Sequence, residues 1–227
     1  MEVLKFELFS PTACFKTPFS LKGIETYPLP TYSTIIGLLY TALGRKWQGE
    51  RFDISLQGRY ETLFRDLVRF RKYNFKDKVL ETLPLSVPTF RNLKVVVHIR
   101  GEKSLIEQFK NALEKPANYL FLSGGEYPVK ISKVSYVSVK QEERTVRNRY
   151  YLTSDIYASE KSNVDVKFAQ KTGICYRLPH FLKSLEPREY MWTLVYYYPA
   201  GTPVYGKLLI DQEGDTVWLC DFTQITG

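Results

Sequence analysis

The sequence predicts an α+β protein, with a ferredoxin-like domain over residues 1–140 followed by a small β-rich domain over residues 141–227. Two observations support this class. Before residue 140 the apolar patterns follow the order strand, helix, strand, strand, helix, strand, which is the split βαβ arrangement. After it the chain is rich in apolar runs of strand length. The polar segment 141–151 is the predicted junction.

The first domain opens with a strand and an irregular loop. Residues 3–9 alternate apolar and polar side chains, which is typical of a strand. Prolines then preclude a regular helix in a loop that carries Lys16, Lys22 and Gly23.

A short apolar helix follows the loop. From Ile36 to Leu43, apolar side chains recur at i, i+3, i+4 and i+7, so they lie on one helix face. Thr31 or Ser33 is the expected N-cap, and Gly44 stands where a left-handed C-terminal cap usually falls.

The next part of the chain is less regular. Residues 45–58 are polar, and residues 60–67 show a short helix-like pattern. Residues 68–75 alternate as a strand does, which places Arg69 and Arg71 on the face opposite to the apolar side chains. Such arginines either protect a solvated strand edge or track phosphates, and the edge is the commoner case.

The first domain ends with a hairpin, a strand, a helix and two more strands. Residues 76–92 predict a long hairpin or loop, and the β-branched run 93–101 predicts a strand. Residues 102–115 form an amphipathic helix pattern that ends at a proline. Residues 119–139 predict strand, Gly-Gly turn and strand.

Four strands are expected in the second domain. They are predicted at residues 173–179, 190–199, 203–210 and 216–222. The last two are expected to form a hairpin that turns at residues 211–215.

The charge of the chain lies mainly in its first part. The 227 residues carry a net charge of +8, and residues 1–141 alone hold 22 Lys+Arg against 13 Asp+Glu. Such an excess is expected of a surface that binds a polyanion. Solubility alone is the other explanation.

Several classes of protein are disfavoured. The longest apolar run is too short to cross a bilayer, and no signal peptide is recognised, so a cytoplasmic protein without membrane contact is expected. The three cysteines have no metal-ligand spacing, and neither a metal nor another cofactor is expected. His98 and His180 both stand in apolar segments, where an imidazole is more often a core residue than a catalyst.

Basic residues interleaved with aromatic rings indicate nucleic-acid binding, since cations track phosphates and exposed rings stack bases. The N-terminus of the first helix, beside a basic loop, is a further expected anion site. An ordinary strand-to-helix connection is an equally good explanation of that loop. The candidate contacts are Lys16, Lys22, Ser33, Thr34, Arg69, Arg71, Lys72, Arg144, Arg147 and Arg149.

One common mode of RNA recognition is not predicted. RNA-recognition motifs stack bases on aromatic rings of their central strands. The strand at residues 93–101, LKVVVHIRG, lacks the expected ring pair, so binding across the open sheet face is not supported.

The N-terminal block resembles CRISPR-associated Cas family 5. YPLPTYSTIIGLL, at residues 27–39, is similar to the proline-then-small-residue helix start of that family, with Gly37 at its characteristic glycine. LSGGE, at residues 122–126, resembles the family's Leu-Gly-x-Ser-Glu turn, and GICYRLP follows later in the same order. Type I-B members are the most similar.

The resemblance implies an RRM-like domain with a protruding β-hairpin and a smaller C-terminal β domain. It implies a subunit of a type I Cascade surveillance complex that binds the 5′ handle of CRISPR RNA (crRNA). The partners implied are the backbone subunit, the large subunit and target DNA near the PAM end.

One branch of the family cuts precursor RNA with a tyrosine and a lysine-histidine pair. Leu43 stands at the tyrosine position, and neither histidine follows a lysine, so no catalytic residue is predicted. Two alternatives stay open. One is a metal-independent endoribonuclease that uses Tyr40, His98 or Lys94. The other is a protein-interaction domain with no role in RNA binding.

Overall fold

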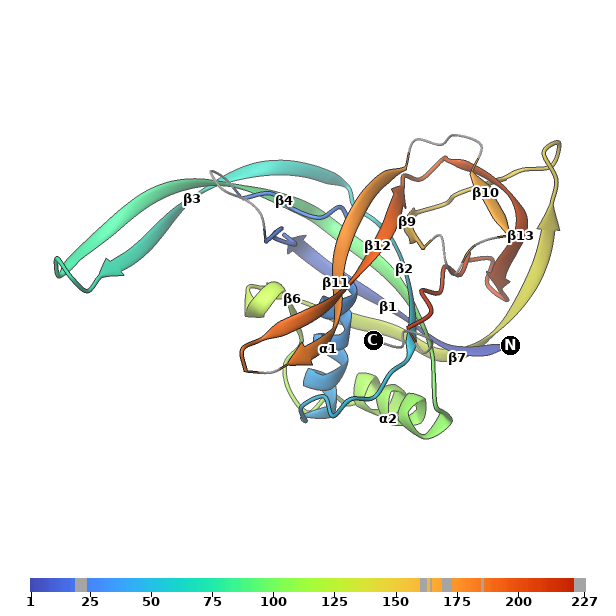
Figure 1. The fold of residues 1–227 in the computed structure, drawn as a ribbon, viewed down its shortest axis with the longest axis horizontal. Helices are drawn as coiled ribbons and strands as arrows, with labels where there is room; N and C mark the ends of the chain where they lie inside the picture. The colour runs from blue at the N-terminus through green and yellow to red at the C-terminus, as the bar shows by residue number, and fades with distance from the viewer. Residues whose placement is uncertain (19–23, 160–162, 164, 169–172, 185, 223–227) are drawn as a thin grey trace.

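The computed structural model describes residues 1–18, 24–159, 163, 165–168, 173–184 and 186–222. It contains one antiparallel sheet of eleven strands, two helices and a small two-stranded sheet (Figure 1). The helices are α1 (Tyr32–Leu43) and α2 (Lys103–Glu114). The first strands are β1 (Glu2–Ala13), β2 (Asp53–Arg59), β3 (Thr62–Asn74), β4 (Val79–Arg100), β5 (Phe121–Leu122), β6 (Tyr127–Pro128) and β7 (Lys130–Arg144). The others are β8 (Tyr150–Tyr151), β9 (Asp155–Ala158), β10 (Val166–Phe168), β11 (Ile174–Ser184), β12 (Glu189–Tyr198) and β13 (Pro203–Asp211).

The centre of the sheet has the order strand, helix, strand, strand, helix, strand, but its second strand is β2 and not the predicted strand at residues 68–75. Its strands run β7-β1-β4-β2, with α1 between β1 and β2 in the chain and α2 between β4 and β7. Both helices lie side by side against one face, where Leu4, Phe6 and Leu8 of β1 are buried beneath them (Figure 1). The buried stripe predicted for α2 is present, and the Phe109 ring packs edge-on against Tyr40 of α1 at 5.6 Å between centroids.

The caps of α1 agree with the sequence. Thr31, rather than Ser33, is the N-cap, because its side chain accepts a hydrogen bond from the Thr34 amide at 3.3 Å. Gly44 closes the helix in the left-handed region at φ 71°, where its backbone N–H bonds the Thr41 and Tyr40 carbonyls.

The polar stretch at residues 45–58 contains a strand that the sequence analysis missed. Strand β2 is covered on both faces, so its polar side chains need partners. Ser55 Oγ accepts a hydrogen bond from the Trp218 amide at 2.8 Å, and Asp53 Oδ1 accepts one from the Phe222 amide at 3.0 Å. The polar residues of β2 therefore bind the C-terminal segment through hydrogen bonds.

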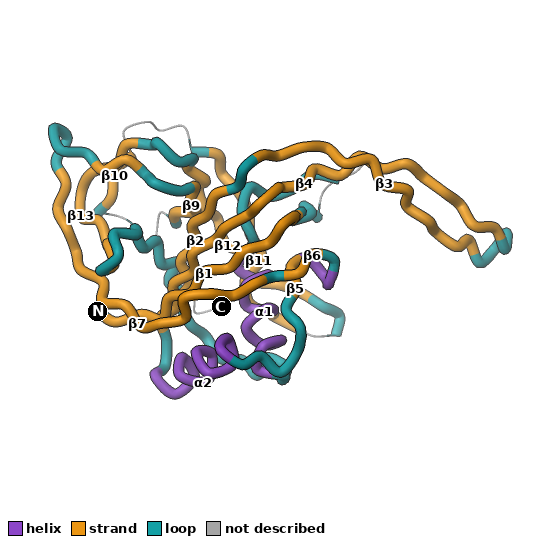
Figure 2. Tube along the Cα trace, turned by 180° about the vertical axis from the view of Figure 1, so that it is seen from behind, coloured by secondary structure: helices purple, strands orange, loops and turns teal. Residues whose placement is uncertain are grey.

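The helix-like pattern at residues 60–67 is a wrong prediction. From Thr62 to Asn74 the chain forms strand β3, which pairs with Val79–Arg91 of β4 in a long hairpin that projects from the body (Figures 1 and 2). Pro84 and Pro88 lie in β4, which is tolerated because this part of β4 pairs with β3 alone and has a free edge.

Residues after 140 extend the same sheet. Strand β7 passes residue 140, and β13 pairs with its end, while β9, β12 and β11 continue the sheet beyond β2. Residues 141–144, part of the predicted junction, thus belong to β7. The division into two domains at residue 140 stays a prediction.

The predicted C-terminal strands are mostly confirmed. Strands β11, β12 and β13 are present, and the chain turns at residues 211–215 as expected. Residues 216–222 do not form a regular strand, and they bridge to Ile210 and Ile54 at isolated positions only.

Candidate nucleic-acid interface

The predicted contact residues lie in three separate places. Ser33 and Thr34 are in the first turn of α1. The hairpin carries Arg69, Arg71 and Lys72, far from the body (Figure 1). The third group, Arg144, Arg147 and Arg149, lies around the turn after β7, at the end of the molecule opposite to the hairpin (Figure 1). Lys22 lies outside the described residues.

The first place is a pocket of about 430 Å³, called the α1 pocket here. It lies between α1, the turn at Ser123–Gly125 and the connection from β11 to β12. Its lining consists of Ser33, Thr34, Gly37, Leu38, Thr41, Tyr119, Phe121, Ser123, Gly124, Gly125, Arg188 and Tyr190. The helix start borders this pocket, but the loops beside it are not the basic loop that the sequence analysis paired with the helix start.

Hydroxyl groups gather at the helix end of the α1 pocket. Thr31 Oγ1 lies 3.0 Å from Ser33 Oγ and 2.9 Å from Thr34 Oγ1. Gly37 lies on the open side of α1, and a Cβ at this position would have no atom within 4 Å. Glycine within a helix costs about 1 kcal/mol relative to alanine, and no contact among the described residues requires it. The glycine leaves the helix backbone accessible from the pocket.

The rim of the α1 pocket is basic and aromatic. The Arg188 guanidinium lies over the Tyr190 ring at 5.3 Å, and Tyr119 is 90% exposed. Lys16 lies nearby and pairs with Glu126 at 3.7 Å, next to the turn. The sequence analysis missed Arg188, Tyr190 and Tyr119. Arg188-Glu189-Tyr190 repeats the basic and aromatic interleaving, and this signal could have identified two of them.

The hairpin has two unlike faces. Partners across an antiparallel ladder share a face, and neighbours along a strand alternate. One face, called the basic face here, carries Arg65, Arg69 and Arg71, with Leu63, Leu67, Tyr73 and Leu80 among them. The opposite face, called the apolar face here, carries Phe64, Val68 and Phe70 of β3 beside Leu83 and Leu85 of β4, with Asp66, Lys72 and Glu81 among them.

The register separates one predicted contact from its neighbours. Lys72 lies opposite Glu81, on the apolar face, while Arg69 and Arg71 lie opposite Pro84 and Thr82 on the basic face. The predicted alternation of the two arginines against the apolar side chains is confirmed. Lys72 points away from them.

The third place is partly neutralised by local partners. Arg144 pairs with Glu142 at 2.5 Å, and Arg149 Nε donates to the Val146 carbonyl oxygen at 2.8 Å. These groups shape the turn between β7 and β8. The turn after β7 lies at the end of the molecule opposite to the hairpin (Figure 1).

The groups considered for RNA cleavage are not assembled. His180 is buried and stacks on Phe222 at 4.5 Å, and burial lowers its pKa to about 4. His98 is fully buried, 3.1 Å from Asp211, whereas Lys94 is exposed. Tyr40 belongs to α1 and lies on the helix side of the sheet, opposite to the face that carries Lys94 and His98. Burial raises the pKa of its hydroxyl.

One acidic cluster has the arrangement of metal ligands within the described ranges. It consists of Asp211, Glu213 and Asp215 in the turn after β13. The ammonium of Lys5 lies within 2.7 Å of an oxygen of each carboxylate. The lysine therefore supplies the positive charge that the cluster needs.

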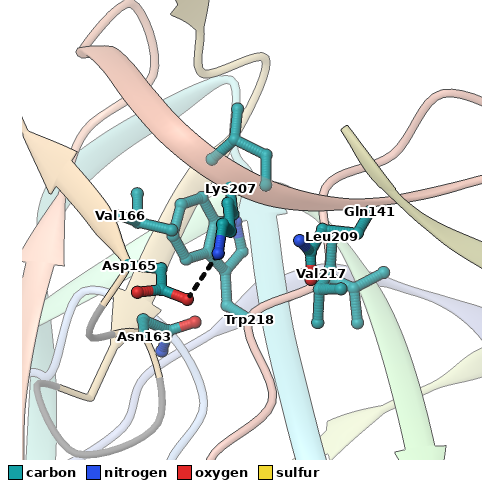
Figure 3. A pocket seen from close by; sticks show the side chains of 9 residues that line it. Gln141, Asn163, Asp165, Val166, Lys207, Leu209, Val217 and Trp218 are labelled. Carbon is teal, nitrogen blue, oxygen red and sulfur yellow. Dashed lines mark ion pairs between the residues drawn. The ribbon is translucent and has the colours of Figure 1, made fainter. Parts of the chain in front are cut away.

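A smaller pocket of about 220 Å³ lies behind β13, with Trp218 at its base (Figure 3). Lys207 and Asp165 face each other across it at 3.8 Å. Its other polar side chains that the structure describes are the amides Gln141 and Asn163. This lining has no cationic group left unpaired for a phosphate.

Solved structures of CRISPR proteins have a similar fold. A chain of a CRISPR RNA-guided surveillance complex is similar with a TM-score of 0.58 and 13% identity, over 88% of this chain and 91% of that one. A CRISPR protein from Archaeoglobus fulgidus has a TM-score of 0.52 and 13% identity, over 97% of this chain and all of the other. A chain of the type III-B Cmr-beta complex has a TM-score of 0.53 and 10% identity, over 88% and 86%.

A match to a family model identifies the family of this chain. The model of the CRISPR-associated protein family (Cas_Cas5) matches residues 3–206. The chain belongs to the Cas5 family. No curated protein is similar enough in sequence to count as a relative. In the part of the chain that the structure describes, no helix is long and apolar enough to cross a membrane.

Proposed function

We propose that this protein is a non-catalytic, RNA-binding subunit of a type I CRISPR surveillance complex, and that it holds the 5′ handle of crRNA. The hairpin is the observation that carries this proposal. Its basic face is suited to a phosphate backbone, and its apolar face needs a protein neighbour. A ribbon with these two faces fits between an RNA strand and another subunit.

The α1 pocket is the proposed seat of the handle. Its hydroxyls and helix N-terminus are donors for phosphate oxygens, and Arg188 with Lys16 supplies positive charge at the rim. Tyr119 and Tyr190 offer rings on which bases stack. Gly37 allows the backbone of the RNA to approach the helix.

The proposed partners are the backbone subunit and the large subunit of the complex. The apolar face of the hairpin is the surface proposed for the backbone subunit. Contact with target DNA near the PAM end and closest relation to type I-B members are carried over from the resemblance of the N-terminal block.

RNA binding in the α1 pocket is tested with the full chain and a crRNA that carries its handle. We expect Arg188→Gln to weaken binding and to reduce the slope of log affinity against log salt by about 0.7, the value for one phosphate of a single strand. Lys115→Gln, on the far end of α2, is the matched control. Equal affinity and slope in the two variants would reject the pocket as the seat of the handle.

The absence of catalysis is tested by incubating precursor crRNA with the protein in EDTA. A non-catalytic subunit leaves the RNA intact and still binds it. Specific cleavage that is lost in Lys94→Gln would instead establish the endoribonuclease alternative. Lys94 is the best probe among those groups because it is exposed, so its replacement does not disturb the core.

A further inference from the structure

The face of the sheet opposite to the helices carries a row of basic side chains. The register places Lys130 of β7 opposite Phe9 of β1, Phe9 opposite Lys94 of β4, and Lys94 opposite Arg59 of β2. Cross-strand partners share a face, so these four side chains form one line across the four central strands. The line is called the basic row here, and it spans about 14 Å at the usual strand spacing.

The basic row borders a hollow. A pocket of about 390 Å³ is lined by all four members of the row, together with Ser132, Ser154 and Glu7. Further along the same face, the turn at residues 211–215 covers Lys5 and His98. The basic row lies beyond this cover, and its three cationic side chains are exposed.

The charges of the row are not compensated within the described residues. Arg59, Lys94 and Lys130 make no ion pair there, and Glu7, the nearest acid on this face, pairs with Lys133 at 2.7 Å. A bulge in β7 at Lys133, with φ 51°, turns this lysine towards Glu7. The face therefore keeps three positive charges beside one neutralised carboxylate.

Protection of a sheet edge does not explain the row. Charged residues on edge strands prevent aggregation, but Lys94 stands on β4 between β1 and β2. Like charges directly opposite each other, as Lys94 and Arg59 are, destabilise a sheet. The arrangement has a cost in the free protein that an anionic ligand would remove.

We propose that the basic row binds a segment of single-stranded nucleic acid, separate from the segment in the α1 pocket. Lys130, Lys94 and Arg59 contact consecutive phosphates, and the half-exposed Phe9 ring stacks on a base. The sequence disfavoured this face because residues 93–101 lack the expected pair of aromatic rings. The structure supplies the ring from β1 instead.

The choice of nucleic acid as the ligand rests on the proposed function, but the test is independent of the handle. The probe is a 20-nucleotide oligouridylate that contains 5-iodouridine and no handle sequence. Its affinity for the full chain is measured against salt concentration for Arg59→Gln/Lys94→Gln/Lys130→Gln. The control is Lys103→Gln/Lys110→Gln/Lys115→Gln on α2, which removes the same charge from the helix side.

We expect the basic-row variant to reduce the salt slope by about 2, because three phosphates of a single strand contribute about 0.7 each. The α2 variant should keep the slope of the natural protein. Irradiation should cross-link the probe to Phe9, and the adduct should be lost in Phe9→Leu. A conservative Arg59→Lys/Lys94→Arg variant should retain both the slope and the adduct.

Two results would overturn the proposal. One is an unchanged slope without an adduct at Phe9. The other is a salt slope of probe affinity that is equal in the two triple variants, together with displacement of the probe from the natural protein by polyglutamate. That result would assign the row to an acidic protein segment. Failure of the handle test alone, with the oligouridylate results as expected, rejects the α1 pocket and leaves the basic row standing.

Discussion

The ammonium nitrogen of Lys5 lies 2.7 Å from Asp211 Oδ2, and both side chains are almost completely buried. The two residues are 206 positions apart, one in the first strand and the other at the end of β13. Glu213 and Asp215 add two further contacts to the same ammonium, at 2.7 and 2.6 Å. This ion cluster joins the beginning of the described fold to its last turn.

Replacement of Lys5 should strongly destabilise the protein. Lys5→Met leaves the buried Asp211 carboxylate with His98 as its remaining side-chain partner. Loss of one member of a buried ion pair costs about 3–5 kcal/mol. Urea unfolding followed by circular dichroism measures the change. Lys133→Met, which removes an exposed lysine paired with Glu7, should cost less than about 1 kcal/mol.

The same cluster predicts a loss of stability in acid. The hydrogen bonds from His98 and Lys5 hold the pKa of Asp211 well below its usual value, although burial opposes them. The folded state therefore binds this proton less readily than the unfolded state, whose aspartate pKa is about 3.9. The contribution of Asp211 is complete above that pH and is lost as the pH falls further.

Asp211→Asn tests this dependence. Thermal unfolding between about pH 6 and pH 2 should show a shallower decline of the free energy of unfolding in the variant than in the natural protein. Parallel curves for the two proteins would contradict the assignment. The raised pKa of Lys5 acts in the opposite range, because its contribution is present below the unfolded value of about 10.4 and is lost at higher pH.

Replacement by alanine should change the stability of the protein in opposite directions at Gly37, within α1, and at Gly44, its C-cap. Gly44 has φ 71°, and a Cβ there would meet the Ala117 Cβ at 2.9 Å. Gly44→Ala should therefore destabilise the protein by about 1–2 kcal/mol. Gly37→Ala meets no atom within 4 Å and should stabilise the helix by up to about 1 kcal/mol.

Gly37 also separates stability from binding. Gly37→Leu places a bulky side chain in the α1 pocket, so crRNA affinity should fall at least tenfold while the melting temperature stays near that of the natural protein. Filter binding and calorimetry measure the two quantities. Undiminished affinity would show that no RNA approaches this side of α1.

The apolar face of the hairpin should matter for assembly and not for folding. Phe70 and Leu83 are 51% and 55% exposed and lie opposite each other on this face. Phe70→Ser/Leu83→Ser should change the free energy of unfolding by less than about 0.5 kcal/mol, as is usual at exposed sites. The variant should nevertheless co-purify poorly with the other subunits. Arg69→Ser/Arg71→Ser, on the basic face, is the control that should retain assembly while it loses RNA affinity.

Local signals predicted the parts of the fold that local interactions determine. Thr31 and Gly44 mark the two ends of α1, because helix caps satisfy backbone groups of the same segment. The stripe of α2 was equally evident, since a single periodicity matches a single buried face. Both predictions needed only neighbours in the chain.

Long-range partners determine the parts that were missed. Strand β2 is polar in sequence because Asp53 and Ser55 bind amides of residues 222 and 218, more than 160 positions away. The helix-like spacing in residues 60–67 was misleading because strand β3 packs no face against the core. Without a buried face, apolar residues in a strand need not alternate with a period of two. The α1 pocket combines three distant segments, so Arg188 and Tyr119 could not be grouped with Ser33 before the fold was known.

Strand β4 extends without an intervening loop from the turn of the hairpin to Arg100 in the middle of the sheet. The hairpin and the central part of the sheet therefore share one continuous strand. A contact at the tip of the hairpin is thus connected to the central sheet by a continuous strand and not by a loop. The placement of the subunit within an assembly can then be decided at a site remote from its core.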